Sequence, residues 1–219
     1  MSKKRKAGER TRGRTDAAGG PRDAEVRIVG GEFRGRRLAY HGDPVVRPMK
    51  HRTREAIFNL VSTECTGRHA IDLFAGTGAL GLEALSRGAA SATFIEKHVP
   101  SAQVVQGNIN TLGVAQRATL LVTSAFLWAK RDLPRPETAP PTNVPWLVFC
   151  SPPYAFYSER QAEMLELIDR IQAHAPAGSI LLVEADERFD FELLRGKEST
   201  HTWWDVRPYP PAVVGVWRR

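Results

Sequence analysis

Three glycines and one acidic residue have the spacing of a nucleotide-binding turn. Gly76, Gly78 and Gly81 form a G-x-G-x-x-G pattern directly after a short apolar run. Glu96 follows Gly76 by 20 residues. Glycines at these positions let a turn at the start of a helix approach a ligand closely, and an acid at the end of the next strand can accept both hydroxyls of a ribose. The pattern therefore predicts a site for a ligand that contains a nucleoside.

A second motif is needed because nicotinamide dehydrogenases share this spacing, and a glycine turn can also serve only to pack a helix on a strand. Ser151-Pro152-Pro153-Tyr154 directly follows the apolar run 146–150. The carbonyl of Pro152 and the hydroxyl of Ser151 can accept hydrogen bonds from an amine, while the ring of Tyr154 can stack on a flat base. Two prolines can also simply end a strand. The presence of both motifs favours chemistry on a base, because S-P-P-Y has no role in a dehydrogenase.

Alternating strand-like and helical patterns predict the elements that bring the motifs together. Such alternation builds an α/β fold with a parallel sheet covered on both faces, in which the carboxyl ends of the strands share one edge. Ser158 and Gln161 are spaced as a capping box at the start of the last helix, and Glu184 directly follows the last of these strands. Two of the expected strands end at Phe74 and Glu96, and three more lie at 118–122, 146–150 and 179–183. The expected helices lie at 79–86, 101–112 and 158–174.

The alternation fails near the end of the chain. Two strand-like runs, 200–206 and 212–217, are separated only by the sequence RPYPP. This connection is too short for a crossover helix, so we expect the two runs to pair antiparallel at one edge of the sheet.

The chain divides into three regions. Residues 1–25 are charged, small or glycine-rich and should form a disordered basic tail. Residues 26–45 alternate apolar and polar residues around Gly30-Gly31 and predict a small β-hairpin extension, and residues 46–219 would form the main domain. Basic residues of the hairpin and of the helix after it are expected to face solvent or to bind RNA or DNA: Arg34, Arg36, Arg37, Arg47, Lys50, Arg52 and Arg54.

Composition narrows the class of protein. The 219 residues include 31 Lys and Arg and 24 Asp and Glu, which gives a formal charge of +7. The first 25 residues have eight basic and four acidic residues and so contribute +4 of this charge. This excess favours a polyanionic partner. No apolar run approaches a membrane span, which needs about 18 residues. Cys65 and Cys150 lack C-x-x-C spacing and the six histidines lack ligand spacing, so we expect buried free thiols, no metal and a cytoplasmic location.

Four segments together resemble a known enzyme family. RIVGGEFRGRRL, RPMKHRTREAIFN, DLFAGTGALGLEALSRGA and SPPY occur in this order, between about Val26 and the C-terminus. They resemble the RsmD family, which methylates N2 of a guanine in small-subunit (16S) ribosomal RNA with S-adenosyl-L-methionine. The resemblance implies a Rossmann-like class I methyltransferase fold, with a mostly parallel seven-stranded sheet, an antiparallel C-terminal pair and an N-terminal β-hairpin. Its partners would be ribosomal RNA or an assembling small subunit, and we expect a monomer.

The resemblance also implies roles for individual residues. Ser151, Pro152, Pro153 and Tyr154 would hold the target base and are the expected catalytic residues. Within the cofactor set, Phe74, Gly76 and Gly78 would border the methionine part, Glu96 would hold the ribose, and Ser124 and Ala125 would lie by the adenine. The full expected cofactor set is Asp72, Phe74, Gly76, Thr77, Gly78, Gly81, Glu96, Lys97, Ser124 and Ala125. No metal is expected, because a sulfonium is already a strong electrophile and positioning supplies most of the acceleration.

Several positions depart from the pattern of the family. The family commonly has Asp where Ser151 stands, and Met49, His51, His98 and Ser124 also differ from its usual residues. Serine is a weaker hydrogen-bond acceptor than a carboxylate. Two alternatives therefore stay open: a catalytically weak or silent RNA-binding or ribosome-assembly homologue, and an amino-methyltransferase that acts on DNA or protein.

Overall fold

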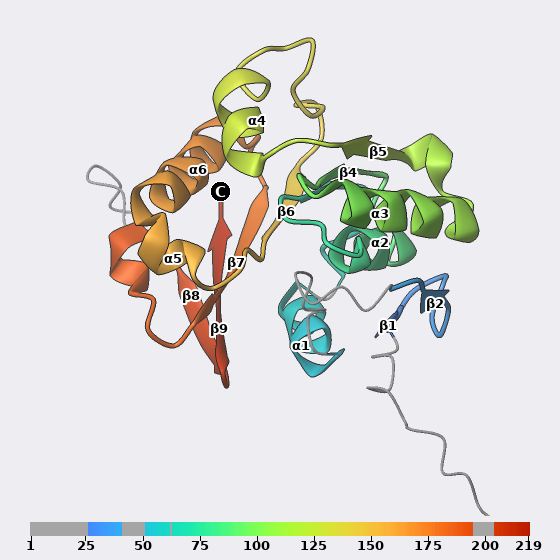
Figure 1. Cartoon of the computed structure of the whole chain (residues 1–219), viewed down its shortest axis with the longest axis horizontal. Helices are drawn as coiled ribbons and strands as arrows, with labels where there is room; N and C mark the ends of the chain where they lie inside the picture. The colour runs from blue at the N-terminus through green and yellow to red at the C-terminus, as the bar shows by residue number, and fades with distance from the viewer. Residues whose placement is uncertain (1–25, 41–50, 62, 195–203) are drawn as a thin grey trace, which may run out of the picture.

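The computed structural model describes residues 26–40, 51–61, 63–194 and 204–219, and the expected tail at 1–25 and the basic residues Arg47 and Lys50 lie outside this part. It shows an α/β fold around one seven-stranded sheet, with a separate two-stranded hairpin (Figure 1). The strand order is β5-β4-β3-β6-β7-β9-β8. The strands are β3 (His69–Asp72), β4 (Ser91–Ile95), β5 (Ala118–Leu121), β6 (Trp146–Cys150), β7 (Ile180–Asp186), β8 (Asp205–Tyr209) and β9 (Ala212–Arg218).

Helices cover both faces of the sheet, as the alternating pattern predicts. On one face, α1 (His51–Val61), α2 (Ala79–Ser86) and α3 (Val99–Leu112) pack with the hairpin β1 (Val26–Arg27) and β2 (Arg37–Leu38). On the other face lie α4 (Ala125–Arg131), α5 (Phe156–Glu159), α6 (Gln161–His174) and the 3-10 turn η2 (Phe191–Leu194). A second 3-10 turn, η1 (Ala115–Arg117), precedes β5. The central strands are buried on both sides, and β6 is accordingly apolar along its whole length, whereas β3, β4 and β7 each include buried polar residues.

The C-terminal strands confirm the expected antiparallel pair. β9 lies antiparallel between β7 and β8, and β8 forms the edge of the sheet. Three residues of the expected connection, Arg207 to Tyr209, belong to β8 itself. An edge strand tolerates Pro208 because one side of the strand needs no ladder hydrogen bond. Most of the run expected at 200–206 lies outside the described residues.

The helix expected at 158–174 is two helices, and the predicted capping box is wrong. α5 and α6 are separated at Arg160, whose backbone (φ −133°, ψ 33°) leaves the helical region. The hydroxyl of Ser158 donates to the carbonyl of Ala155 (3.1 Å) and does not cap α6. The break orients the guanidinium of Arg160 over the ring of Phe126, 4.1 Å from its centroid. A contact with a residue 34 positions away, rather than local capping, therefore accompanies the boundary.

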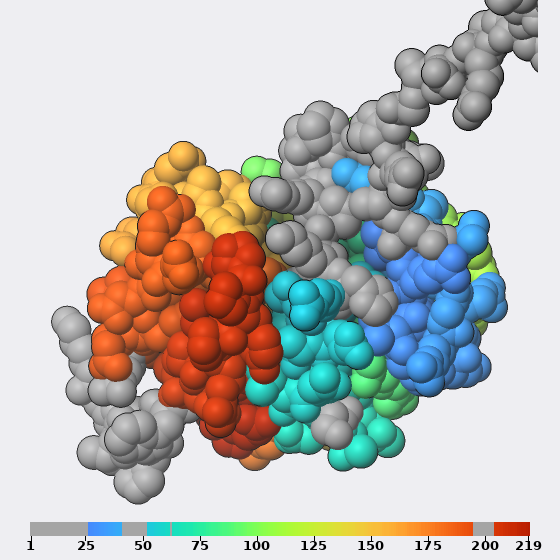
Figure 2. Space-filling view, turned by 90° about the horizontal axis from the view of Figure 1, so that it is seen from below, coloured from blue at the N-terminus to red at the C-terminus, as the bar shows by residue number. Residues whose placement is uncertain are grey.

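The N-terminal hairpin is joined to α2 by a buried carboxylate. The backbone N–H groups of Val29 and Gly30 each donate to Glu83 at 2.7 Å, and Glu83 is fully buried. Gly31 has φ +76°, and a Cβ there would lie 1.9 Å from the carbonyl oxygen of Ser86, so this turn requires glycine. The hairpin and α1 lie side by side on one face of the molecule (Figure 2).

The structure contradicts the expectation that Arg54 faces solvent. Its side chain is 1% exposed, and its guanidinium donates to the carbonyl of Arg27 and lies 4.0 Å from Glu83. The hairpin covers this face of α1, which no pattern within the helix could reveal. Burial lowers the pKa of Arg54, while Glu83 opposes that shift. Arg54 is therefore an internal cation that fastens the hairpin, and we exclude it from the proposed RNA surface.

Candidate active site

The glycine turn and the S-P-P-Y turn leave two adjacent strands at the same edge of the sheet. β3 pairs parallel with β6, with Asp72 opposite Phe149. Just beyond, the N–H of Leu73 donates to the carbonyl of Phe149 at 3.0 Å. Parallel strands bring their carboxyl ends together, so the two motifs, about 75 residues apart in sequence, begin next to each other.

The glycine turn has the backbone conformation that its sequence predicts. Gly76 and Gly78 have φ angles of 56° and 78°, in the left-handed region that favours glycine. The carboxylate of Glu96 holds the turn, because it accepts the N–H of Gly76 and the N–H of His98, each at 2.8 Å. Gly81 has a different role: a Cβ there would lie 2.3 Å from Cε1 of Phe94, so glycine is needed to pack α2 on β4.

Asp72 places a second acid beneath this turn. One carboxylate oxygen accepts the N–H of Gly81 at 3.0 Å, and the other has no hydrogen-bond partner among the described residues. Asp72 is 1% exposed, and this burial, with a smaller contribution from Glu96, raises its pKa to about 7. A positive charge close to the turn would favour the ionised form of this buried carboxyl group.

Aromatic rings from three segments gather beside the two turns. Phe74 of the glycine turn lies 5.9 Å from Phe126 of α4 and 6.2 Å from Phe156 of α5, measured between ring centroids. Lys97 contacts the ring of Phe156 at 5.3 Å, and Ser124 and Ala125 directly precede Phe126. The expected cofactor residues at 74, 97 and 124–125 therefore share one neighbourhood. Sequence reasoning missed Phe126 and Phe156, although each lies within two residues of a predicted site residue.

Glu184 is the functional candidate that the motifs do not contain. The hydroxyls of Ser151 and Tyr154 both donate to its carboxylate, Tyr154 at 2.8 Å, and the hydroxyl of Tyr157 donates to its backbone carbonyl at 2.9 Å. Glu184 lies on β7, beside β6, and is 7% exposed. Pro152 is buried and Pro153 exposed. The one signal in the sequence was an acid directly after an apolar strand.

The basic residues expected to meet nucleic acid fall into different environments. Arg34, Arg36 and Arg37 of the hairpin and Arg52 of α1 are exposed. Arg36 also donates to the carbonyl of Thr111 at 2.8 Å, so the hairpin is fastened to α3. The described basic surface is therefore centred on the hairpin.

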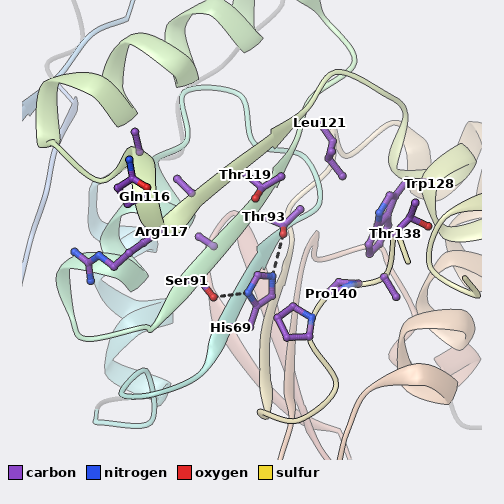
Figure 3. A pocket seen from close by; sticks show the side chains of 15 residues that line it. His69, Ser91, Thr93, Gln116, Arg117, Thr119, Leu121, Trp128, Thr138 and Pro140 are labelled. Atoms are coloured by element: carbon purple, nitrogen blue, oxygen red, sulfur yellow. Dashed lines mark hydrogen bonds between the residues drawn. The ribbon is translucent and has the colours of Figure 1, made fainter. Parts of the chain in front are cut away.

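A separate pocket of about 390 Å³ lies at the opposite end of the central strands (Figure 3). His69 at the start of β3 bonds Ser91 (2.8 Å) and Thr93 (2.9 Å), as the dashed lines in the figure show. Burial lowers the pKa of His69 to about 4, so its ring is neutral. The lining also includes Thr119, and Trp128, Thr138 and Pro140 lie opposite His69. This pocket includes none of the predicted site residues.

Three further observations concern the described residues alone. Cys65 and Cys150 are both free and buried, which confirms that expectation. Within the ranges that the structure describes, no three acidic, histidine or cysteine side chains gather closely enough to hold a metal ion. Among the helices of the same ranges, none has the length and apolar character needed to cross a bilayer.

Comparisons with known proteins agree with this geometry. Ribosomal RNA small subunit methyltransferase D of Escherichia coli (strain K12) is 36% identical over 130 residues, which cover 59% of this chain and 61% of that relative, less than two thirds of its length. The protein of the same name from Haemophilus influenzae is 34% identical over 138 residues, 63% of this chain and 68% of the relative. The solved structure of Escherichia coli yhhF has a TM-score of 0.69 at 26% identity and covers 89% of this chain and 98% of its own.

A family model described as conserved hypothetical protein 95 matches residues 26–200. This match spans the hairpin, the glycine turn and the S-P-P-Y turn, which are the segments that carry the resemblance. The chain therefore belongs to this family, the RsmD family.

Proposed function

We propose that this protein transfers a methyl group from S-adenosylmethionine to the exocyclic N2 amine of a guanine in small-subunit (16S) ribosomal RNA. The observation that carries the proposal is the meeting of the glycine turn and the S-P-P-Y turn at the ends of β3 and β6. The names of the relatives support ribosomal RNA as the acceptor. The substrate would be the RNA itself or an assembling small subunit.

The residues of the glycine turn fit the proposed cofactor. Bound there, S-adenosylmethionine would supply an electrophilic methyl group on a positively charged sulfur. Gly76 and Gly78 present backbone without a side chain, and Asp72 keeps one buried carboxylate oxygen without a partner among the described residues. Glu96 already accepts two backbone N–H groups, and its oxygens have further lone pairs for the ribose hydroxyls. Thr77, Lys97, Ser124 and Ala125 would complete the site.

The S-P-P-Y turn would act on the target base by orienting its amine. The lone pair of a guanine amine is delocalised into the ring, so acceptors on its N–H groups must turn the nitrogen toward the methyl group. The hydroxyl of Ser151 and the carbonyl of Pro152 would be these acceptors, and Tyr154 would stack on the base. Alignment of this kind contributes roughly 7 to 11 kcal/mol to lowering a barrier. The base must leave its helix to reach the turn, so we expect a loop or an extruded guanine.

The exposed arginines of the hairpin would bind the phosphates of the RNA. Arg34, Arg36 and Arg37 lie on a segment that two hydrogen bonds to the buried Glu83 join to α2, the helix that the glycine turn opens. A fixed distance between phosphate contacts and the reacting turn would set the register of the substrate. Arg52 of α1 would extend this surface.

The test is incubation of the full chain with labelled S-adenosylmethionine and separate acceptors: 16S ribosomal RNA, assembled small subunits, DNA and protein. We expect label only in ribosomal RNA, at N2 of a guanine, located by mapping modified guanines in cells with and without the protein. Label in DNA or protein would show that the acceptor is not ribosomal RNA and would contradict the proposed substrate. Tight cofactor binding without transfer to any acceptor would instead support the silent RNA-binding homologue that the serine at position 151 suggests.

A further inference from the structure

We infer that Glu184 is a positioning residue of the methyl-transfer site, whose carboxylate, on the strand next to the S-P-P-Y turn, orients the hydroxyls of Ser151 and Tyr154. This inference rests on the function proposed above and concerns a residue outside the S-P-P-Y motif.

The register of the sheet brings Glu184 to the turn. β6 and β7 are parallel, with Cys150 opposite Val183, so the next residue on each strand is Ser151 and Glu184. The hydroxyl of Ser151 donates to one oxygen of Glu184, and the hydroxyl of Tyr154 donates to the other at 2.8 Å. One buried carboxylate therefore holds both polar side chains of the turn.

These bonds determine how Ser151 can meet an amine. A hydroxyl has one proton and two lone pairs, and the proton of Ser151 is directed to Glu184. Its lone pairs are therefore the groups left to accept an N–H from the target. A hydrogen bond to a charged acceptor is stronger than a neutral one and polarises the bonds next to it, so the serine oxygen becomes a better acceptor.

The same arrangement accounts for the proton that the reaction releases. When the new N–C bond forms and the S–C bond breaks, the positive charge moves from sulfur to the amine. The amine then returns to neutrality by giving one proton to the oxygen of Ser151 while the hydroxyl proton passes to Glu184, which later releases it to water. Charge and atoms balance without any further reactant.

Glu184 could alternatively serve only to fasten the turn, since its backbone carbonyl also accepts the hydroxyl of Tyr157. A purely structural residue and a positioning carboxylate differ in one respect: only the second can be replaced by an acid at position 151. The test therefore compares four proteins with 16S ribosomal RNA and assembled small subunits as acceptors: the natural chain, Glu184→Gln, Ser151→Asp and the double variant.

We expect Glu184→Gln to bind S-adenosylmethionine as the natural protein does and to lose about 100-fold in kcat, the usual scale for a positioned proton acceptor. Ser151→Asp should also lose activity, because it puts two carboxylates within hydrogen-bonding distance. The double variant should recover at least tenfold over Glu184→Gln, because a single acid again faces the amine. Unchanged kcat in Glu184→Gln, or a double variant no better than Glu184→Gln, would overturn the inference.

Failure of the proposed function gives a different result. In that case the natural protein itself transfers no label to ribosomal RNA, and the four proteins cannot be ranked. Thermal unfolding of each variant, followed by circular dichroism, separates loss of fold from loss of rate. If Glu184→Gln unfolds, Ser151→Ala provides a milder test, because it removes the hydroxyl through which Glu184 would act and keeps the bond from Tyr154 to Glu184. A comparable loss of kcat without loss of cofactor binding supports the inference, and no loss contradicts it.

Discussion

The N–H of Leu73 donates to the carbonyl of Phe149 at 3.0 Å, close to where the segments after β3 and β6 leave the sheet. Gly76 follows Leu73 by three residues, and Ser151 follows Phe149 by two. The two turns that carry the proposed chemistry are therefore fixed relative to each other by paired backbone and not by flexible side chains.

The first prediction concerns Tyr154. Tyr154→Ala removes the ring and should abolish most turnover while S-adenosylmethionine binding, measured by calorimetry, survives. Tyr154→Phe keeps the ring for stacking and removes the bond to Glu184, so its kcat should fall between those of Tyr154→Ala and the natural protein. Unchanged turnover of Tyr154→Ala would remove this residue from the mechanism.

The second prediction compares two helical glycines. Gly81→Ala puts a Cβ 2.3 Å from Cε1 of the fully buried Phe94, and such overpacking typically costs about 1–3 kcal/mol. Gly107→Ala in α3 has nothing within 4 Å of the added Cβ and should stabilise the protein by roughly 0.5–1 kcal/mol. Urea unfolding of both variants measures the difference. Equal effects would mean that Gly81 is not required for packing.

Sequence reasoning predicted the parts of the fold that local patterns specify. Apolar runs of four to seven residues located the strands, the glycine spacing located the turn at 76–78, and the short RPYPP link indicated the antiparallel end. The same reasoning placed both motifs at one edge, because parallel strands bring their carboxyl ends together.

The remaining features depend on contacts between distant segments. Arg54 looked like a solvent-facing residue because a helix pattern cannot show that a hairpin covers it. Glu184 received no role because its partners, Ser151 and Tyr154, lie 30 or more residues away. The break at Arg160 likewise comes with a contact to a ring of α4. Residues whose partner lies on another element were the ones that the sequence could not assign.

The third prediction tests how the hairpin is held. Glu83→Gln leaves the buried guanidinium of Arg54 without its nearby carboxylate and removes the ion pair with Arg87 (2.8 Å), and breaking a buried pair typically costs about 3–5 kcal/mol. Glu32→Gln alters an exposed pair with Arg117 (3.9 Å) and serves as the matched control, with a loss of at most about 1 kcal/mol. Hydrogen exchange should show faster opening of residues 26–38 only in Glu83→Gln. Equal exchange in both variants would contradict this role.

The fourth prediction concerns the proposed RNA surface. Replacement of Arg34, Arg36 and Arg37 together by alanine should weaken RNA binding. It should also reduce the slope of the logarithm of the binding constant against the logarithm of the salt concentration, by roughly 0.7 for each lost phosphate contact. Arg131 and Arg135, exposed near the loop between α4 and β6, provide the matched control. Filter binding at several salt concentrations measures both slopes. A larger change of the slope in the control variant would mean that RNA does not bind at the hairpin.

The fifth prediction follows from the raised pKa of Asp72, about 7 in the free protein. A cationic ligand favours the ionised carboxylate, so binding of S-adenosylmethionine below pH 7 should release a proton from Asp72. The affinity for S-adenosylmethionine should therefore fall by up to tenfold for each pH unit below 7. Asp72→Asn can still accept the N–H of Gly81 but cannot ionise. Its affinity should be lower at pH 8 and independent of pH between 6 and 8.

The same group fixes the sign of a stability effect in the absence of cofactor. Because the folded-state pKa of Asp72 lies above its ordinary value of 3.8, its contribution to stability is fully present below that value and is lost as the pH rises through 7. The natural protein should therefore lose stability relative to Asp72→Asn between pH 5 and pH 8, measured as the difference in urea midpoint. A difference that stays constant over this range would mean that Asp72 is already ionised in the fold, and the dependence of cofactor binding on pH should then disappear as well.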